Sequence, residues 1–296
     1  MIKRSVFRSR LLPYFLILPQ ILITLTFFYW PAFQGLINSF VRSDPFGGHY
    51  KFIWFENFLA LFRDPLYLES VLITLVFSLC TAFLAISSGL FLASMANRAL
   101  RAKAVIRTFL IWPYAVAPAI SGILWLFLLH PSFGLVSIFI NKWFGANWNP
   151  VLNGRDAMVM IILASSWKQI SYNFVFFIAG MQAIPKSLIE AAAIDGASPF
   201  RRFWKITLPL LSPTMFFLTV MNIIFAFFET FGVIHTVTQG GPGGSTNILV
   251  YKVYQDGFVG LDLGSSSAQS VLLMSLIILI TVLQFRYVEK KVQYTA

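Results

Sequence analysis

A small polar group interrupts a long apolar stretch of the chain. Lys168 is the one charged residue in residues 157–185. Three polar side chains fall within about a 100° arc on one helix face with it: Ser165, Gln169 and Tyr172. An ammonium group beside an amide and a hydroxyl can bind a phosphate and a polyol. The alternative is a structural lysine that pairs with a carboxylate or with helix carbonyls.

A second stripe follows in the next apolar run, residues 206–228, and at its end. It combines Thr219, Asn222 and Glu229 with the small Ala226 at helical spacing. Glu229 is a candidate partner for Lys168, but at ~1.5 Å rise per residue the two differ in depth by ~10 Å, so pairing is not favoured. We expect both stripes to line one passage. Its candidate residues are Lys168, Gln169, Tyr172, Asn222 and Glu229.

The residues that most enzymes use are missing or scattered. The three histidines stand far apart, and no HExxH, CxxC or GxSxG motif occurs. Residues 240–246 are rich in glycine but lack the lysine of a phosphate-binding P-loop, so they are interpreted as a tight turn. Cys80 is the only cysteine, and we expect it to be a buried structural thiol. We therefore predict no catalytic residue and no metal site.

The composition indicates a membrane protein. Charged residues make up 11% of the 296 residues, against roughly 25% in soluble proteins, and hydrophobic residues reach 58%. A soluble core cannot bury that much apolar surface, and a disordered chain would be poor in aromatic residues. In a membrane, a charge at mid-depth costs roughly 2.5–3.5 kcal/mol, so Lys168 is by default a candidate functional residue. The predicted fold class is all-α, a polytopic membrane protein.

Six apolar runs reach the ~20 residues that a helix needs to cross ~30 Å of hydrocarbon. They are residues 11–29, 70–97, 108–141, 157–185, 206–228 and 263–285, and the third is apolar as far as His130. The connecting segments alternate in charge, with fifteen Lys and Arg residues in one set and six in the other. The positive-inside rule places the first set and both termini in the cytoplasm. The net charge of +11 is therefore a topology signal, and we predict no nucleic-acid partner.

The runs divide the chain into three predicted parts. Residues 1–69 contain a basic tail, a first helix at about residues 11–33 and an outer loop. Residues 70–288 form a five-helix core, and residues 289–296 form a cytoplasmic tail. Between the fourth and fifth runs, the core contains a cytoplasmic loop at residues 184–206.

The sequence of this cytoplasmic loop predicts a first short helix with small side chains. Ser187 is a candidate N-cap for a helix over residues 188–194, with Glu190 in its first turn near the positive end of the helix dipole. Asp195 and Gly196 end the helix, because glycine adopts the left-handed C-terminal conformation easily. A face of little bulk suits close docking of another protein; its small residues are Ala191, Ala192, Ala193 and Ala197.

A second short helix follows in the same loop. Ser198 and Pro199 begin it, and it is expected over residues 200–206. Pro209 and Pro213 then bend the start of the fifth run. The loop is therefore expected to be a helix–turn–helix at the cytoplasmic membrane face.

The spacing of the loop resembles the signature of permease subunits in binding-protein-dependent ABC importers. The matching pattern is Glu190-Ala191-Ala192, three residues, Gly196, nine residues, Ile206, one residue and Leu208-Pro209. The resemblance implies the transmembrane fold that such type I importer permeases share. In that family the short helix is a coupling helix, which docks in a cleft of the ATPase subunit and transmits nucleotide-driven closure to the spans.

The resemblance also implies the contacts and partners of this chain. The ATPase contact would be formed by Glu190, Ala191, Ala192, Asp195 and Gly196. The expected partners are a second homologous permease, an ATPase homodimer that binds ATP and Mg, and a periplasmic or lipid-anchored solute-binding protein. The two polar stripes would then face the interface with the second permease. The chain itself would be a multi-pass protein of a bacterial inner membrane, embedded in lipid, with no cofactor and no enzymatic activity of its own.

Other segments resemble the carbohydrate-type branch of this family. One is Thr238-Gln239-Gly240-Gly241-Pro242 with Thr246, Tyr251 and Tyr254. Residues 167–174, 257–262 and 268–270 are similar to permeases of importers for sn-glycerol-3-phosphate. The implied function is ATP-driven import of sn-glycerol-3-phosphate or a related glycerophospho compound, with a neutral sugar or polyol as the alternative. The outer residues 41–69 and 235–262 would either dock the binding protein or lie in the interfacial aromatic belt.

Two other classes of transport protein remain as alternatives. A secondary transporter needs carboxylates near the midplane and usually has inverted repeats, whereas Glu229 is the only carboxylate at hand and no repeat is evident. A channel would have no use for the loop at residues 184–206.

Overall fold

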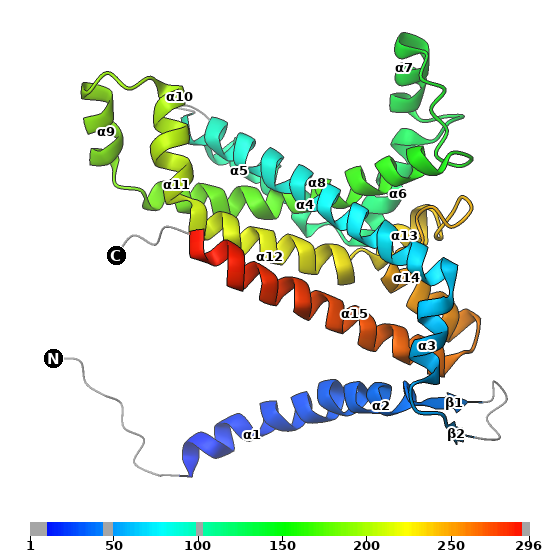
Figure 1. Ribbon diagram of the computed structural model, residues 1–296. Helices are drawn as coiled ribbons and strands as arrows, with labels where there is room; N and C mark the ends of the chain where they lie inside the picture. Colours follow the sequence, from blue (N-terminus) through cyan, green and yellow to red (C-terminus); the bar gives the residue numbers. More distant parts are fainter. Residues whose placement is uncertain (1–10, 44–49, 99–102, 292–296) are drawn as a thin grey trace. The chain divides into compact units, whose positions relative to one another are not determined.

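The computed structural model describes residues 11–43, 50–98 and 103–291. These residues form two compact units (Figure 1). The first consists of the chain up to Arg63 together with Val253–Leu272, and the second of Asp64–Lys252 together with the chain from Leu273.

The first unit contains a long, almost fully exposed helix. Helix α1 (Leu12–Thr24) continues through a π-helical turn (Leu25–Tyr29) into α2 (Trp30–Asn38), which makes 27 residues apolar enough to cross a membrane. The expected first helix is confirmed, and it extends past Pro31 to Asn38. Pro31 comes just after the π-helical turn, and such a local widening accommodates the missing N–H of a proline within a spanning helix.

A small β-hairpin follows this helix. Strands β1 (Val41–Ser43) and β2 (Tyr50–Phe52) pair antiparallel, with Val41 opposite Phe52. Helix α3 (Glu56–Arg63) packs onto the hairpin through Asn57, whose amide donates to the carbonyls of Ser39 and Val41 at 2.9 and 3.1 Å. The all-α fold class is confirmed for the chain, but the sequence reasoning did not anticipate this two-stranded sheet.

The second unit consists of helices joined by turns, with no strand among the residues that the structure describes. Its helices are α4 (Pro65–Arg98), α5 (Lys103–Ile111), α6 (Pro118–Leu129), α7 (Leu135–Phe144), α8 (Gly154–Ala183), α9 (Lys186–Ile194), α10 (Pro199–Arg202), α11 (Leu208–Leu210), α12 (Ser212–Phe228) and α13 (Phe231–Val237). Helix α14 (Leu249–Tyr254) lies at its boundary, and α15 (Leu263–Leu283) enters it at Leu273.

Three helices are long and apolar enough to cross a membrane, and up to six if each bent helix pair counts as one span. Two predicted spans are bent. The third bends by 108° between residues 107–115 and residues 118–129, and the fifth by 66° at Leu211. Pro118 explains the first bend, because a proline disfavours the helical conformation in the residue before it, and Ala117 is extended with ψ 145°. Pro213 in the first turn of α12 fits the bend expected in the fifth span.

Helix α8 is the centre of this unit, and α4, α6 and α12 pack against it (Figure 1). The core between them is apolar and includes Phe174, Phe177 and Leu218, each at most 1% exposed. Where α4 crosses α8, Gly89 lies so close that a Cβ atom on it would approach the Cβ of Asn173 to 2.7 Å.

A reciprocal pair of side-chain amides joins α8 and α12 within this unit. Asn173 of α8 and Asn222 of α12 are both fully buried and exchange side-chain hydrogen bonds of 3.2 and 2.7 Å. Asn222 also donates to the carbonyl of Leu218 at 2.7 Å. A reciprocal amide pair of this kind satisfies groups that would be costly to bury alone.

We predict that the two asparagines are energetically coupled. Asn173→Ala or Asn222→Ala alone leaves a buried amide without its partner and should lower the free energy of unfolding by about 1–3 kcal/mol. The double variant should lose clearly less than the sum of the single losses. The measurement is unfolding of the purified chain in detergent, followed by tryptophan fluorescence. Thr219→Ala is the matched control on α12, because its hydroxyl bonds only the carbonyl of Met215 in its own helix. Additive losses would contradict the coupling.

Candidate functional site

The loop between α8 and α12, expected on the cytoplasmic side, forms the predicted helix–turn–helix. Helix α9 begins at Lys186, two residues before the predicted start. The prediction of Ser187 as N-cap is wrong, because the extended Pro185 (ψ 126°) already occupies that position and no side chain bonds the helix start there. Glu190 consequently lies beyond the first turn. The carboxylate is therefore too far from the helix start to stabilise it through the helix dipole.

The turn after α9 confirms the role expected for Gly196. Its φ of +78° lies in the left-handed region that favours glycine. The amide of Ala197 donates to the carbonyl of Ala192 at 3.0 Å, and the amide of Gly196 to that of Ala193 at 3.1 Å, as in a Schellman motif. Ser198 then caps α10 by accepting from the amide of Arg201 at 3.3 Å, as expected. The direction of the chain between the two helices is thus fixed by backbone bonds.

Helix α9 is exposed along its whole length, and none of its residues is buried. Of the expected contact residues, Glu190, Ala191, Asp195 and Gly196 are exposed and Ala192 is half-buried. Ile194, at the end of the helix, is 87% exposed. A single exposed aliphatic side chain is ordinary on a protein surface, but at this position Ile194 is accessible to a partner.

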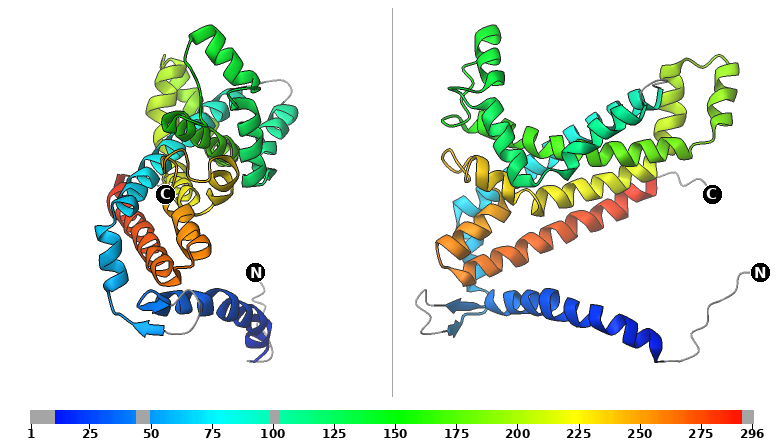
Figure 2. Two further views of the ribbon diagram at one scale, coloured as in Figure 1. Left: turned by 90° about the vertical axis from the view of Figure 1, so that its right-hand side faces the viewer. Right: turned by 180° about the vertical axis from the view of Figure 1, so that it is seen from behind.

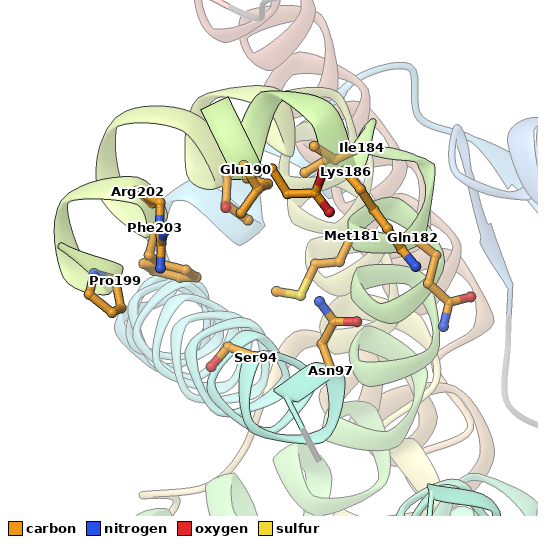
Figure 3. Close-up of a pocket in the computed structure, with 12 residues that line it drawn as sticks. Ser94, Asn97, Met181, Gln182, Ile184, Lys186, Glu190, Pro199, Arg202 and Phe203 are labelled. Atoms are coloured by element: carbon orange, nitrogen blue, oxygen red, sulfur yellow. The ribbon is translucent and has the colours of Figure 1, made fainter. Parts of the chain in front are cut away.

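A pocket of about 560 Å³ lies behind α9. In Figure 3, Lys186 and Glu190 of α9 and Arg202 of α10 surround it, with Met181 of α8 at its base. Ser94 and Asn97 at the C-terminal end of α4 complete the wall. Helix α9 is therefore separated by open space from the end of α4, while α8 and α10 carry it at its two ends.

A second pocket, of about 80 Å³, lies within the helical bundle. It gathers four of the five residues predicted for the passage. Its lining consists of Tyr114, Lys168, Gln169, Tyr172, Met221, Ile224, Phe225 and Glu229. Lys168 is at the middle of the 30-residue α8, as its place in the apolar run indicated. The polar stripe on α8 therefore faces a cavity.

Tyr114 is a pocket residue that the sequence reasoning missed. The Nζ atom of Lys168 lies 5.8 Å from the centroid of its ring, a cation–π geometry. The same ring stacks on Tyr172 at a centroid distance of 5.6 Å. Tyr114 reaches the pocket because it belongs to a 3-10 turn, Trp112–Ala115, directly before the bend in the third span. The available signal was the pair of prolines, Pro113 and Pro118, around a tyrosine inside an apolar run.

Asn222 does not line this pocket, because it is fully buried in the amide pair with Asn173. The other members of the predicted stripes also lie away from it: Ser165 and Ala226 are buried, and Thr219 bonds within its own helix. Glu229 follows the last residue of α12 and is exposed. In the part of the chain that the structure describes, Glu229 and Lys168 form no ion pair within 4 Å. The offset in depth between them explains this.

Two further expectations have clear outcomes. The glycine-rich segment is a turn, with Gly240, Gly243 and Gly244 at positive φ and the hydroxyl of Thr246 donating to the carbonyl of Gly241 at 2.7 Å. The prediction that Cys80 is buried is wrong, since its side chain is exposed on α4. An apolar run does not reveal which side of a helix faces its neighbours, because every side of such a helix tolerates lipid.

The fold is that of an ABC importer permease. The chain superposes with a TM-score of 0.81 on a chain from a bacterial ABC transporter involved in the import of the acidic polysaccharide alginate, over 94% of this chain and 95% of that one at 22% identity. A second alginate transporter structure, in complex with an alginate pentasaccharide-bound periplasmic protein, gives 0.82 at 20% identity, with 96% of each chain covered. At these identities the similarity establishes the fold alone.

The sequence establishes the family. Residues 85–294 match the model of the binding-protein-dependent transport system inner membrane component, and the chain belongs to this family. It is 56% identical over 292 residues to the sn-glycerol-3-phosphate transport system permease protein UgpA of Rhizobium meliloti, with 99% of both chains covered. It is 51% identical over 291 residues to the protein of the same name from Escherichia coli O157:H7, with 98% of both covered. The resemblance stated from the motifs is confirmed, and the chain is a membrane-embedded permease component.

We predict that Gly196 keeps the loop closed. In Gly196→Ala a side chain would occupy left-handed backbone at a cost of about 1–2 kcal/mol. Local opening of the loop should then increase roughly five- to thirtyfold. The measurement is the rate of trypsin cleavage at Arg201 and Arg202 in the folded protein. Ala193→Ser is the matched control, because Ala193 is exposed and helical. Equal cleavage rates for the glycine and control variants would contradict the prediction.

Proposed function

We propose that this chain forms, together with a second homologous permease, the path for ATP-driven import of sn-glycerol-3-phosphate or a related glycerophospho compound. The observation that carries the proposal is a lysine ammonium facing a cavity at the middle of a span. The names of the relatives, which match this chain over nearly its whole length, support the same substrate. ATP and Mg would bind to a separate ATPase homodimer, and the chain itself would carry no cofactor and no catalytic residue.

The chemistry of the pocket fits an anionic polyol. Lys168 supplies a cation and donors, Gln169 an amide and Tyr172 a hydroxyl, all from one side of α8. Tyr114 holds the lysine by its ring and thereby orients the ammonium without neutralising it. Since about 80 Å³ is small for a binding site, the rest of the passage would be supplied by the second permease.

We predict that Lys168→Ala lowers uptake of sn-glycerol-3-phosphate at least about tenfold, because one charge-assisted contact to phosphate is worth about 1.5–3 kcal/mol. Lys168→Arg should retain part of the activity, because the arginine keeps the positive charge but replaces the compact ammonium by a planar guanidinium. Uptake is measured with radiolabelled substrate in cells that lack their own importer. The control readout is the amount of assembled complex in the membrane.

The result separates the alternatives for this lysine. Unchanged uptake by Lys168→Ala with normal assembly would overturn the phosphate role. Loss of assembly in both variants would instead assign Lys168 to a structural position. If the intact transporter hydrolyses ATP in response to neutral sugars but not to sn-glycerol-3-phosphate, the proposed substrate is wrong.

The loop between α8 and α12 would couple ATP hydrolysis on the ATPase to movement of the spans. Helix α9 would dock in a cleft of the ATPase, with Glu190 near basic groups and Ala191 and Ala192 allowing close approach. The backbone-fixed turn at Gly196 and the cap at Ser198 would let α9 and α10 move as one piece. A rigid loop held between two bodies can transmit a hinge motion, so that ATP hydrolysis would change the balance of inward- and outward-facing states.

We predict that Ile194→Asp weakens capture of the ATPase about ten- to a hundredfold, because burial of one large aliphatic side chain contributes about 1.5–3 kcal/mol. Ile194→Leu is the matched control and should bind normally. The measurement is co-purification of the ATPase with the tagged permease from a mild detergent, at several ATPase concentrations. Equal capture by the aspartate and leucine variants would contradict docking through α9. In that case a channel or a secondary transporter would regain support.

The remaining assignments follow from the same proposal. A periplasmic or lipid-anchored solute-binding protein would deliver the substrate, and the chain would cross a bacterial inner membrane several times with both termini in the cytoplasm. The distribution of Lys and Arg supports this orientation. The alginate transporter structure that shares this fold contains a bound periplasmic protein, which agrees with a partner of this kind.

A further inference from the structure

Helix α7 (Leu135–Phe144) is too short to span a membrane and belongs to neither pocket. Its ten residues extend ~15 Å, half of the hydrocarbon thickness. Figures 1 and 2 show it running across the direction of α8, whereas α12 runs along α8. It precedes the first residue of α8, Gly154, so it lies at the opposite end of that span from the coupling loop.

The polar residues of α7 point inward. Ser137 is fully buried and donates to the carbonyls of Gly134, at 2.9 Å, and His130. Asn141, one turn further on, accepts from the amide of Trp148 at 2.6 Å. The indole of Trp148 in turn donates to the carbonyl of Leu129 at 2.9 Å, the last residue of α6. These bonds fix the rotation of α7 about its own axis.

The opposite side of α7 is apolar and exposed. Leu135 is 76% exposed and Trp143 is 72% exposed, and Phe139 between them on the same face is exposed as well. Ile138 and Phe144 are also exposed but lie beside this face. Lys142 is the only charged residue in the whole stretch from residue 131 to residue 153. A buried aromatic side chain removes 150–250 Å² from water, and large exposed apolar patches mark contact with lipid or another protein. This side of α7 is therefore covered in the working protein.

We propose that α7 lies in the plane of the membrane surface, with its apolar side among the lipid acyl chains. The side chains of α7 continue a surface that already faces outward from a span. Phe133, just before α7, stacks on His130 at a centroid distance of 3.9 Å and lies 5.8 Å from the exposed Phe127 of α6. Aromatic residues at the level of the lipid headgroups are typical of such interfaces.

Lipid fits this side better than a water-soluble partner does. A solute-binding protein exchanges between free and docked states, so the surface that it leaves must tolerate water, and the apolar side of α7 offers one charge in that stretch of 23 residues. Lys142 also fits lipid, because a lysine at the edge of an apolar face can extend its ammonium to headgroup phosphates. In-plane attachment would fix the outer end of α8 at the membrane surface. The outer end of α8 would then stay at a constant depth in the membrane when the helix moves.

The test places spin labels on α7 in the full chain, reconstituted in vesicles of phosphatidylethanolamine and phosphatidylglycerol. In a Cys80→Ala background, the labelled positions are Phe139→Cys and Trp143→Cys. Arg155→Cys is the matched control at the same end of α8, because Arg155 is charged and exposed. Electron paramagnetic resonance compares collision of each label with oxygen, which concentrates in lipid, and with a water-soluble nickel chelate. Lipids labelled at known depths calibrate the signal.

At positions 139 and 143 we expect collision with nickel at least about fivefold lower than at Arg155, and collision with oxygen higher, at a depth of about 5–10 Å. Labels on α7 that meet nickel as often as the control would overturn the proposal. Low collision with both reagents would overturn it too, because it would show that protein covers this side. Addition of a solute-binding protein should leave the α7 signals unchanged, and protection on its addition would assign the surface to that partner instead.

Discussion

At membrane depth every polar group must be paired within the protein or must face a water-filled space, and helix α8 depends on both solutions. On one side Asn173 exchanges hydrogen bonds with Asn222 across the α8–α12 contact, where Gly89 lets α4 approach closely. On another side Lys168, Gln169 and Tyr172 open to a pocket. The amide pair fixes the neighbours of α8, and this fixed packing holds the lysine toward the cavity. Because unpaired polar groups are so costly in hydrocarbon, the same constraint positions the site and stabilises the bundle.

Bends in the helices also position the residues of the pocket and of the loop. The bend before Pro118 brings the turn of Trp112–Ala115 beside α8, so that Tyr114 reaches Lys168. The bend at Leu211 turns the chain from the exposed loop into α12. In the loop, exposed residues are held by backbone hydrogen bonds rather than by a core. Packing thus controls the pocket, while local turn geometry controls the surface proposed for coupling. The loop joins the bundle through α8 and α12, the two helices that carry the buried amide pair.

The apolar helices, the all-α class and the helix–turn–helix loop could be predicted from the sequence because each depends on local properties. Three features can be recognised in a sequence without knowledge of distant contacts: the length of an apolar run, the placement of Lys and Arg, and the residues that end short helices. The same holds for Gly196, whose left-handed φ follows from its position after α9. Ser187 shows the limit of this reasoning, since Pro185, two positions before it, occupies the N-cap instead, and the local pattern does not decide between the two.

The tertiary structure alone decided which sides of these helices face one another. A helix of uniformly apolar residues has no preferred side, because lipid and neighbouring helices are equally apolar. For this reason Cys80 is exposed although it lies in an apolar run, and Asn222 joins Asn173 although its spacing suited the passage. Tyr114 enters the pocket only through a bend of 108° between two helical segments. The sequence determined the family, the spans and the loop, whereas rotation about each helix axis required the packed structure, since it depends on contacts between segments far apart in the chain.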